Sequence, residues 1–271
     1  IILLSGGYVL YSNNTLTYVE EAPPSNISDS IDIKKQQEES PLLELKTRKE
    51  NSAKEMYSLN VEYPAVVLAT DPTLARVASD VVKGEVDRMI APFLEEAREM
   101  AKNERLPAES ASDLTIRYQP TLLTPTLMAI RFERSAYLRG AAHPDSGSTM
   151  LLFDLVDRAH LETGDLFIPG QDYLDFLSAY SRQYLRNNFK DLSNQEFEQS
   201  VILGTEPKQE NFREVSIDPK GINIIFNPYQ VAPYARGTVI VSIPFEEVRN
   251  RLSTRVRDAI ESAQKPRNEG I

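Results

Sequence analysis

The chain has 271 residues, enough for one or two domains, and its 41% hydrophobic and 26% charged residues exclude a wholly disordered protein. Its 40 acidic and 30 basic residues give a net charge of −10, which argues against a nucleic-acid partner, because phosphate contacts need a basic surface. Cysteine is absent and the only histidines are His143 and His160, so we expect neither a cofactor nor a metal ion. A charged partner of this chain would be basic.

Residues 1–19 are apolar, and the first charge follows at Glu20. Two interpretations are open for this segment: the outer end of a cropped transmembrane or signal-anchor helix, or a short buried strand of a soluble domain. We favour the anchor because of residues 20–55, which contain no aromatic residue and no glycine and carry mixed charge. Such a composition predicts a disordered tether, with an ordinary disordered N-terminal arm as the alternative.

The folded part begins with a strand pattern over residues 57–63, and we expect Pro64 to end that strand or to place it at an edge. Asp71-Pro72 predicts a helix start, because Asp is a good N-cap and proline suits the first helical position. Pro92 interrupts the apolar stripe of this helix, so a kink or a short break is expected there.

The rest of the chain alternates between strand pairs and helices. Alternating residues predict a hairpin from 114–118 and 128–132, and the continuous apolar run at 150–156 predicts a strand buried on both faces. The remaining expected elements are helices over 171–190 and 194–201, strands near 212–217, 221–226 and 237–243, and one last helix from Pro244.

This order of elements indicates the fold class. Strand pairs separated by helices, without a regular strand–helix repeat, favour an α+β fold with a mixed, mainly antiparallel sheet packed with three to four helices. We place an N-terminal α+β subdomain at 56–139, a C-terminal α+β domain at 140–264 and a frayed tail at 265–271.

The loop Gly140–Asp145 is the first candidate site. Its small residues let backbones approach closely, and the His-Pro pair stiffens the residues after it. A lone histidine in such a loop is most often structural, with a ring N–H donated to a carbonyl group. We still include His143, Pro144 and Asp145 in a candidate binding surface. The spacing of His160 from His143 and Asp145 matches no known metal-binding motif.

The loop Asn227–Gly237 is the second candidate site. Two prolines stiffen it, and two tyrosines offer flat amphipathic faces at a low cost in entropy, which suits contact with a protein or a sugar. The alternative is that the tyrosines close the end of the core. The candidate binding residues here are Tyr229, Tyr234 and Arg236.

Motifs of known hydrolases and nucleotide-binding proteins are missing from the sequence. There is no G-x-S-x-G, H-E-x-x-H, P-loop or G-x-G-x-x-G motif. Adjacent carboxylates such as Glu95-Glu96 and Glu246-Glu247 are typical of solvated helix faces. A catalytic carboxylate pair that is distant in sequence stays possible, because separation in space cannot be read here.

Several short segments resemble the C-terminal domain of RsiV-type proteins, and the region before them is similar to a domain that also precedes the catalytic part of some peptidoglycan deacetylases. The resemblance covers about residues 56–255 and rests on Val61–Pro64, Gly140–Pro144, Phe153–Leu155, Thr163–Phe167, Phe226–Tyr229, Pro233–Gly237 and Val239–Phe245.

This resemblance implies an extracytoplasmic, membrane-tethered α+β domain. The family includes anti-sigma factors that bind lysozyme, and a net charge of −10 would suit so basic a partner. The sigma-binding segment of that family is not in this chain, and neither is a deacetylase domain.

The residues and the resemblance leave three hypotheses. The first is a non-enzymatic binding or sensor module on the outer face of the bacterial cytoplasmic membrane, attached through its N-terminal segment only, or periplasmic or secreted if that segment is processed. It would recognise lysozyme or a cell-wall-associated protein. The second is an enzyme that acts on cell-wall polysaccharide, or the accessory domain of one. The third is a structural envelope domain without a ligand.

Overall fold

The computed structural model describes residues 3–4, 7–12, 15–20, 40–106, 110–189 and 195–265 of the chain. The chain divides into two compact units, Ile1–Gln36 and Gln37–Ile271. The first contains an antiparallel sheet of β1 (Leu3–Leu4), β2 (Gly7–Ser12) and β3 (Thr15–Glu20).

The described residues of the first unit are therefore strands, in place of the helix end that we expected over 1–19. The sequence offers a reason, because Tyr, Val and Thr favour strands and glycine disfavours a helix. Among the residues that the structure describes, no helix is long and apolar enough to cross a membrane.

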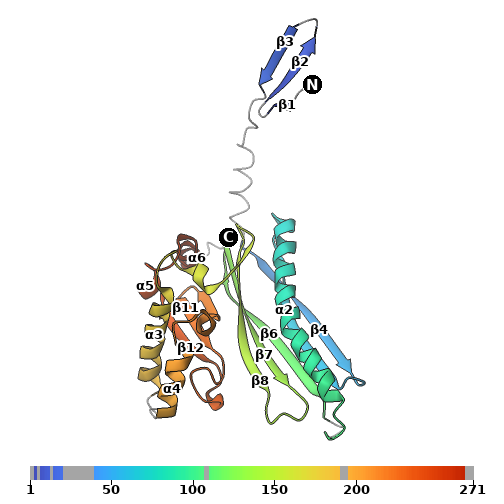
Figure 1. Cartoon of the computed structure of the whole chain (residues 1–271), viewed down its shortest axis with the longest axis vertical. Helices are drawn as coiled ribbons and strands as arrows, with labels where there is room; N and C mark the ends of the chain where they lie inside the picture. Colours follow the sequence, from blue (N-terminus) through green and yellow to red (C-terminus); the bar gives the residue numbers. More distant parts are fainter. Residues whose placement is uncertain are drawn as a thin grey trace, which may run out of the picture. The chain divides into compact units, whose positions relative to one another are not determined.

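The second unit is built on a six-stranded sheet of order β4-β5-β6-β7-β8-β9 (Figure 1). All its pairs are antiparallel except β5–β6, whose parallel pairing is bridged by helix α2. The mixed, mainly antiparallel α+β prediction is thus confirmed. The strands are β4 (Leu42–Ser52), β5 (Tyr57–Val67), β6 (Ser112–Leu123), β7 (Leu127–Tyr137), β8 (Asp145–Asp154) and β9 (Ala159–Leu161).

Strand β4 lies inside the segment that we expected to be a disordered tether. It pairs with β5 from Leu42↔Val67 to Ser52↔Tyr57, yet none of its residues is buried. Backbone pairing rather than apolar burial therefore holds it, and composition does not reveal such an edge strand. Of the earlier part of the expected tether, Glu20 is described as the end of β3, and residues 21–39 lie outside the described residues.

Strand β5 does not end at Pro64, which pairs with Leu45 of β4. Its parallel pairing with β6 ends before this residue, at Val61.

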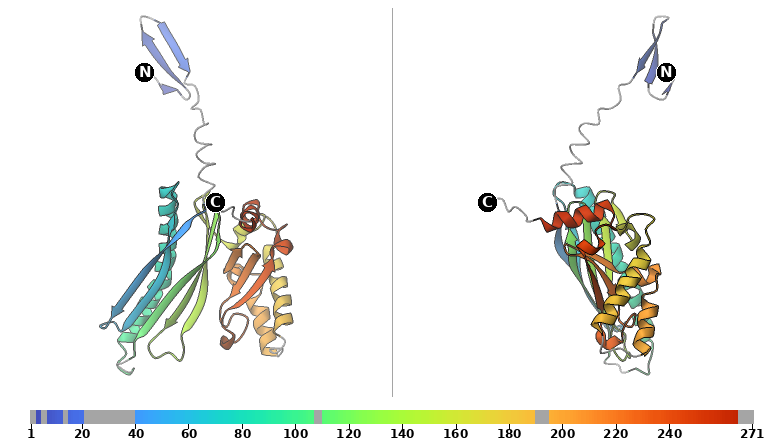
Figure 2. Two further views of the ribbon diagram at one scale, coloured as in Figure 1. Left: turned by 180° about the vertical axis from the view of Figure 1, so that it is seen from behind. Right: turned by 90° about the vertical axis from the view of Figure 1, so that its left-hand side faces the viewer.

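Helix α2 (Pro72–Ala101) lies along one face of this sheet (Figures 1 and 2). As predicted, Asp71 is the N-cap and accepts a hydrogen bond from the Leu74 N–H at 2.9 Å. The helix continues across Pro92, so the expected break is absent. Its buried side chains, such as Phe93, form one hydrophobic core with side chains from β5 to β8.

The six-stranded sheet β4–β9, called the first sheet below, extends past the domain boundary that we expected at residue 140. Strands β8 and β9 pair onto β7, so this sheet ends only at Leu161. The reason lies in β8, which is buried on both faces as predicted. Leu151 and Phe153 pack in the core under α2, whereas Leu152 packs in a second core on the other side.

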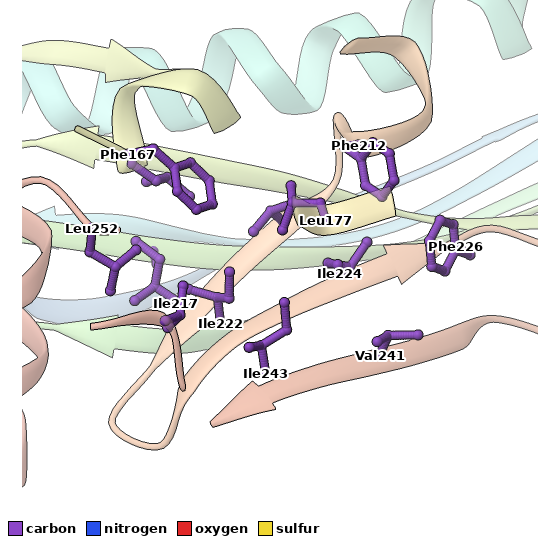
Figure 3. Close-up of a cluster of buried hydrophobic side chains, with 14 of the residues drawn as sticks. Phe167, Leu177, Phe212, Ile217, Ile222, Ile224, Phe226, Val241, Ile243 and Leu252 are labelled. Carbon is purple, nitrogen blue, oxygen red and sulfur yellow. The ribbon is translucent and has the colours of Figure 1, made fainter. Parts of the chain in front are cut away.

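That second core is enclosed by a three-stranded antiparallel sheet of order β10-β11-β12 and by helices (Figure 3). The single last helix that we expected is split, because residues 249–253 turn between α5 and α6, and Leu252 bridges to Phe167. The elements are β10 (Val215–Asp218), β11 (Gly221–Phe226), β12 (Val239–Pro244), α3 (Tyr173–Asn188), α4 (Gln195–Gly204), α5 (Phe245–Val248) and α6 (Thr254–Gln264).

Candidate functional site

The two loops singled out from the sequence lie against each other. The ring of His143 stacks on that of Tyr234, with centroids 4.2 Å apart and planes inclined by 29°. The ring of Tyr229 lies 5.4 Å from that of Tyr234, again between centroids. The Tyr234 hydroxyl donates a hydrogen bond to the Pro144 carbonyl at 2.7 Å. We call His143, Tyr229 and Tyr234 the aromatic cluster.

Strand β8 and helix α4 hold the second loop in place. The Asn227 side chain accepts from the Ser148 N–H at 2.7 Å and donates to the Ser148 carbonyl at 3.2 Å. The Gln230 amide donates to the carbonyl groups of Gly204 and Asn211 at 3.3 and 2.9 Å. Both ends of the turn that carries Tyr229 are therefore tied to neighbouring segments of the fold.

The aromatic cluster faces solvent and contains a strained residue. Tyr229 is 65% exposed and has a φ of 70°, a left-handed conformation that is a genuine outlier for a bulky side chain. Its exposed ring contributes little burial to offset the strain, which costs on the order of 1–3 kcal/mol. Val231 and Ala232, rather than the tyrosines, pack into the core at this loop. Strain with an exposed ring indicates a surface shaped for contact.

The other predicted residues of the two loops have different neighbours. The carbonyl contact expected for His143 is present, because its Nδ1 lies 2.9 Å from the Pro144 oxygen. Asp145 accepts from Arg134 at 2.7 Å. The Arg236 guanidinium lies over the Phe189 ring, 5.4 Å from its centroid.

A cavity of about 530 Å³ lies between α2, β8, β9 and the segment before β10. Sequence reasoning missed it, although one signal was available: Glu85 interrupts the apolar stripe of α2 between Val82 and Met89. We call this space the carboxylate cavity. It is lined by Glu85, Arg88, Thr149, Met150, Leu152, His160, Leu161, Glu162, Thr163, Gln209, Glu210, Phe212, Arg213 and Glu214.

Two acids of the carboxylate cavity, the buried Glu85 and the half-buried Glu214, already have partners. Glu214 accepts a hydrogen bond from the Met150 N–H at 2.6 Å, and Glu85 is ion-paired with Arg88. Burial raises the pKa of Glu214, and the negative charge of Glu85 adds to this, while the Met150 bond opposes it. Within the described residues, no group of three or more His, Asp or Glu side chains could hold a metal ion.

A second hollow, of about 450 Å³, lies on the face of the first sheet that is turned away from α2. Thr115 and Arg117 of β6, Arg131, Glu133 and Ser135 of β7, and Ser146 and Ser148 of β8 alternate with the core residues under α2 and share one face of the sheet, whereas Arg134 and Gly147 have the register of the other face. We call it the arginine groove. It is lined by Thr115, Arg117, Arg131, Glu133, Arg134, Ser135, Ser146, Gly147, Ser148, Thr238 and Ile240.

The fold resembles two solved structures. A DUF3298 family member from Bacteroides fragilis matches with a TM-score of 0.58 and 21% identity over 81% of this chain and 98% of that one. A DUF3298 family protein from Pseudomonas aeruginosa matches with a TM-score of 0.56 and 15% identity over 80% and 94%. At these identities the likeness concerns the fold alone.

Sequence comparisons extend this likeness. The peptidoglycan-N-acetylmuramic acid deacetylase PdaC of Bacillus subtilis is 28% identical over 167 residues, which cover 59% of this chain and 34% of PdaC. The chain thus spans about a third of the length of this curated relative. Residues 164–246 match the family model described as "Protein of unknown function (DUF3298)". Residues 164–246 are thus similar to the DUF3298 family, and a longer part of the chain is similar to about a third of the PdaC deacetylase.

Proposed function

We propose that this chain is a non-catalytic accessory module of the cell wall, which works outside the cytoplasm and binds wall glycan through the aromatic cluster. The observation that carries the proposal is the arrangement of His143, Tyr229 and Tyr234, three neighbouring rings from two loops that are held at the surface. Kinship with a deacetylase whose name specifies peptidoglycan supports the choice of ligand.

The chemistry of the aromatic cluster fits a sugar. Aromatic rings are rigid and amphipathic, so they offer contact area while few rotamers are frozen on binding. The C–H groups on one face of a pyranose ring can lie flat on such a surface. The Tyr229 hydroxyl and the Nε2 of His143 provide polar partners at the rim of the same surface, while the Tyr234 hydroxyl and the His143 Nδ1 contact the Pro144 carbonyl.

The carboxylate cavity offers the concave two-carboxylate site that a wall-degrading enzyme would need. We propose a structural role for it instead. Glu214 is bonded to the backbone of β8 and Glu85 to Arg88, so both acids serve contacts within the fold. Glu214 thereby ties the segment before β10 to the first sheet.

A basic protein such as lysozyme is the second candidate partner. The net charge of −10 favours it, because opposite charge accelerates encounter at low salt. The resemblance to RsiV-type proteins points the same way. In this version the chain is a membrane-tethered sensor module, and the aromatic cluster is its contact surface.

Cosedimentation of the full chain with purified peptidoglycan sacculi tests the first candidate. We expect binding that weakens at least fivefold in the double variant Tyr229→Ala/Tyr234→Ala, since aromatic residues at the centre of a contact surface contribute most of its energy. Leu203→Ala is the matched control, because Leu203 is 53% exposed on α4 and should not affect binding.

Titration with a C-type lysozyme at low salt separates the two candidates. Binding of sacculi without binding of lysozyme supports the glycan version. If the chain binds lysozyme but not sacculi, and the double variant loses this binding, lysozyme replaces wall glycan as the proposed partner. Binding of neither would contradict both.

A further inference from the structure

The arginine groove adjoins the aromatic cluster. Arg134, which lines the groove, donates to Asp145 at 2.7 Å, and Asp145 directly follows the Pro144 carbonyl that Tyr234 contacts. Thr238, which comes directly after the loop of Tyr234, lines the groove as well. A ligand lying on the aromatic cluster can therefore extend into the groove.

The arginines of the groove are not all neutralised by the fold. Arg131 donates to Glu133 at 2.9 Å, and Arg134 is paired with Asp145. Arg117 lies opposite Glu133 in the register, but the Glu133 carboxylate contacts Arg131 instead. Across the described residues, Arg117 has neither an ion-pair nor a hydrogen-bond partner, and its side chain is exposed. A chain of net charge −10 thus has an available cation here.

A second observation in the groove also indicates a missing partner. The Nε of Arg131 is buried, and within the described part of the chain it has no hydrogen-bond partner. A buried donor without an acceptor lowers the stability of the fold, so an unsatisfied donor in the lining of a groove indicates that a polar partner is missing there. Arg131 and Arg117 lie on neighbouring strands and line the same groove.

The remaining lining specifies the class of ligand further. Hydroxyl groups of Thr115, Ser135 and Ser146 line the groove, and Ser146 donates to Ser135 at 3.5 Å. Hydroxyl groups exchange hydrogen bonds readily with sugar hydroxyl and acetamido groups. The volume of about 450 Å³ is within the range of small-ligand sites.

We propose that the arginine groove binds the carboxylate of an acidic sugar in a wall glycan, while a neighbouring ring of the same glycan lies on the aromatic cluster. The guanidinium of Arg117 meets the carboxylate in a charge-assisted contact, and the hydroxyl groups that line the groove bond to the same sugar. This inference rests on the proposed glycan-binding function and names the sugar that the site selects.

Calorimetric titration of the full chain with three soluble tetrasaccharides tests the inference. The first alternates N-acetylglucosamine with N-acetylmuramic acid, the second is its methyl ester, and the third contains N-acetylglucosamine only. We expect the acid to bind on the order of tenfold more tightly than the other two, because only it carries the charge that Arg117 recognises.

Two variants test whether the arginine groove causes the tighter binding of the acidic tetrasaccharide. Arg117→Gln should reduce affinity for the acid about tenfold and leave affinity for the ester and the neutral glycan unchanged. Arg76→Gln is the matched control, since it changes the net charge equally on a distant exposed face of α2 and should alter no affinity. Thermal unfolding confirms that both variants fold, and the comparison of acid with ester needs no variant.

Three results would overturn the inference. Equal affinity for acid, ester and neutral glycan would remove carboxylate recognition and leave glycan binding by the aromatic cluster intact. The same would hold if Arg76→Gln weakened binding of the acid as much as Arg117→Gln, since net charge alone would then explain the preference. If no tetrasaccharide binds at about 1 mM, the proposed glycan function fails together with the inference.

Discussion

The carboxylate cavity and the arginine groove are two hollows on successive parts of one strand. Residues 149, 150 and 152 of β8 line the cavity, and residues 146–148 line the groove. Both contain charged side chains, and the cavity also borders α2, whereas the groove lies on the face of the sheet that is turned away from α2. They differ at particular side chains: Glu214 and Glu85 of the cavity have partners, whereas Arg117 of the groove has none among the described residues.

In the cavity, Glu214 and Glu85 are bonded to a backbone N–H and to an arginine. Beside the aromatic cluster, Arg117 is unpaired among the described residues, the Arg131 Nε has no acceptor there, and Tyr229 is strained and exposed. Buried polar groups that satisfy one another contribute to the fold, whereas unsatisfied groups and strain are features that a ligand can use. The size of a hollow alone does not distinguish the two cases.

The largest effect is expected at Gly204, where the loop of the aromatic cluster packs on α4. A Cβ built there would lie 2.0 Å from the Gln230 carbonyl oxygen, so Gly204→Ala forces the loop to move. We expect a loss of about 1–3 kcal/mol in the free energy of unfolding, together with weaker glycan binding. Urea denaturation and sacculus cosedimentation measure the two effects.

Gly84→Ala is the matched control for that variant. Gly84 is also helical, but a Cβ there meets nothing within 4 Å. Alanine should therefore stabilise α2 by about 0.5–1 kcal/mol and leave binding unchanged. Equal stability changes at the two glycines would show that the loop is not packed as described.

A similar effect on stability, but none on binding, is expected at Glu214, which tests the structural role of the cavity. Glu214→Ala leaves the Met150 N–H without its partner and should cost about 1–3 kcal/mol in stability, with no change in glycan affinity. Glu214→Gln keeps an oxygen acceptor and should cost much less. A large loss of glycan binding in either variant, with stability intact, would make the cavity a candidate binding site again.

The same residue gives a pH dependence with a definite sign. Burial raises the pKa of Glu214 above its usual 4.5, so the folded chain binds this proton more tightly than the unfolded chain does. Its contribution to stability is therefore most favourable below pH 4.5 and declines as the pH rises through the raised pKa. Glu214→Gln should remove that decline, as urea denaturation across this pH range would show.

The smallest stability effect is expected at Tyr229. Asparagine tolerates the left-handed backbone better than tyrosine, and the lost contact with the Tyr234 ring opposes this gain, so Tyr229→Asn should change the free energy of unfolding by about 0.5 kcal/mol or less. Binding to sacculi should nevertheless fall severalfold, because the exposed ring is lost. A variant that binds as well as the original chain would show that Tyr229 is no contact residue.

Local patterns predicted most elements of the second unit. The start of α2 follows from the capping chemistry of Asp71-Pro72, and the strands near β6, β7 and β11 follow from their apolar patterns. Strand β4 was missed because an edge strand held by backbone pairing need not carry an apolar pattern. The last helix was predicted unbroken because its apolar spacing continues through Leu252, which in fact bridges to Phe167.

The α+β class and the two loops rich in aromatic residues and proline follow from the amino-acid order. Local propensity and apolar periodicity act over a few residues, and both can be read along the chain. Long-range packing brings these loops together, bonds Glu214 to the backbone of β8, and leaves Arg117 without a partner among the described residues. Such properties depend on strand register and on contacts between residues far apart in sequence, which the linear order does not encode locally.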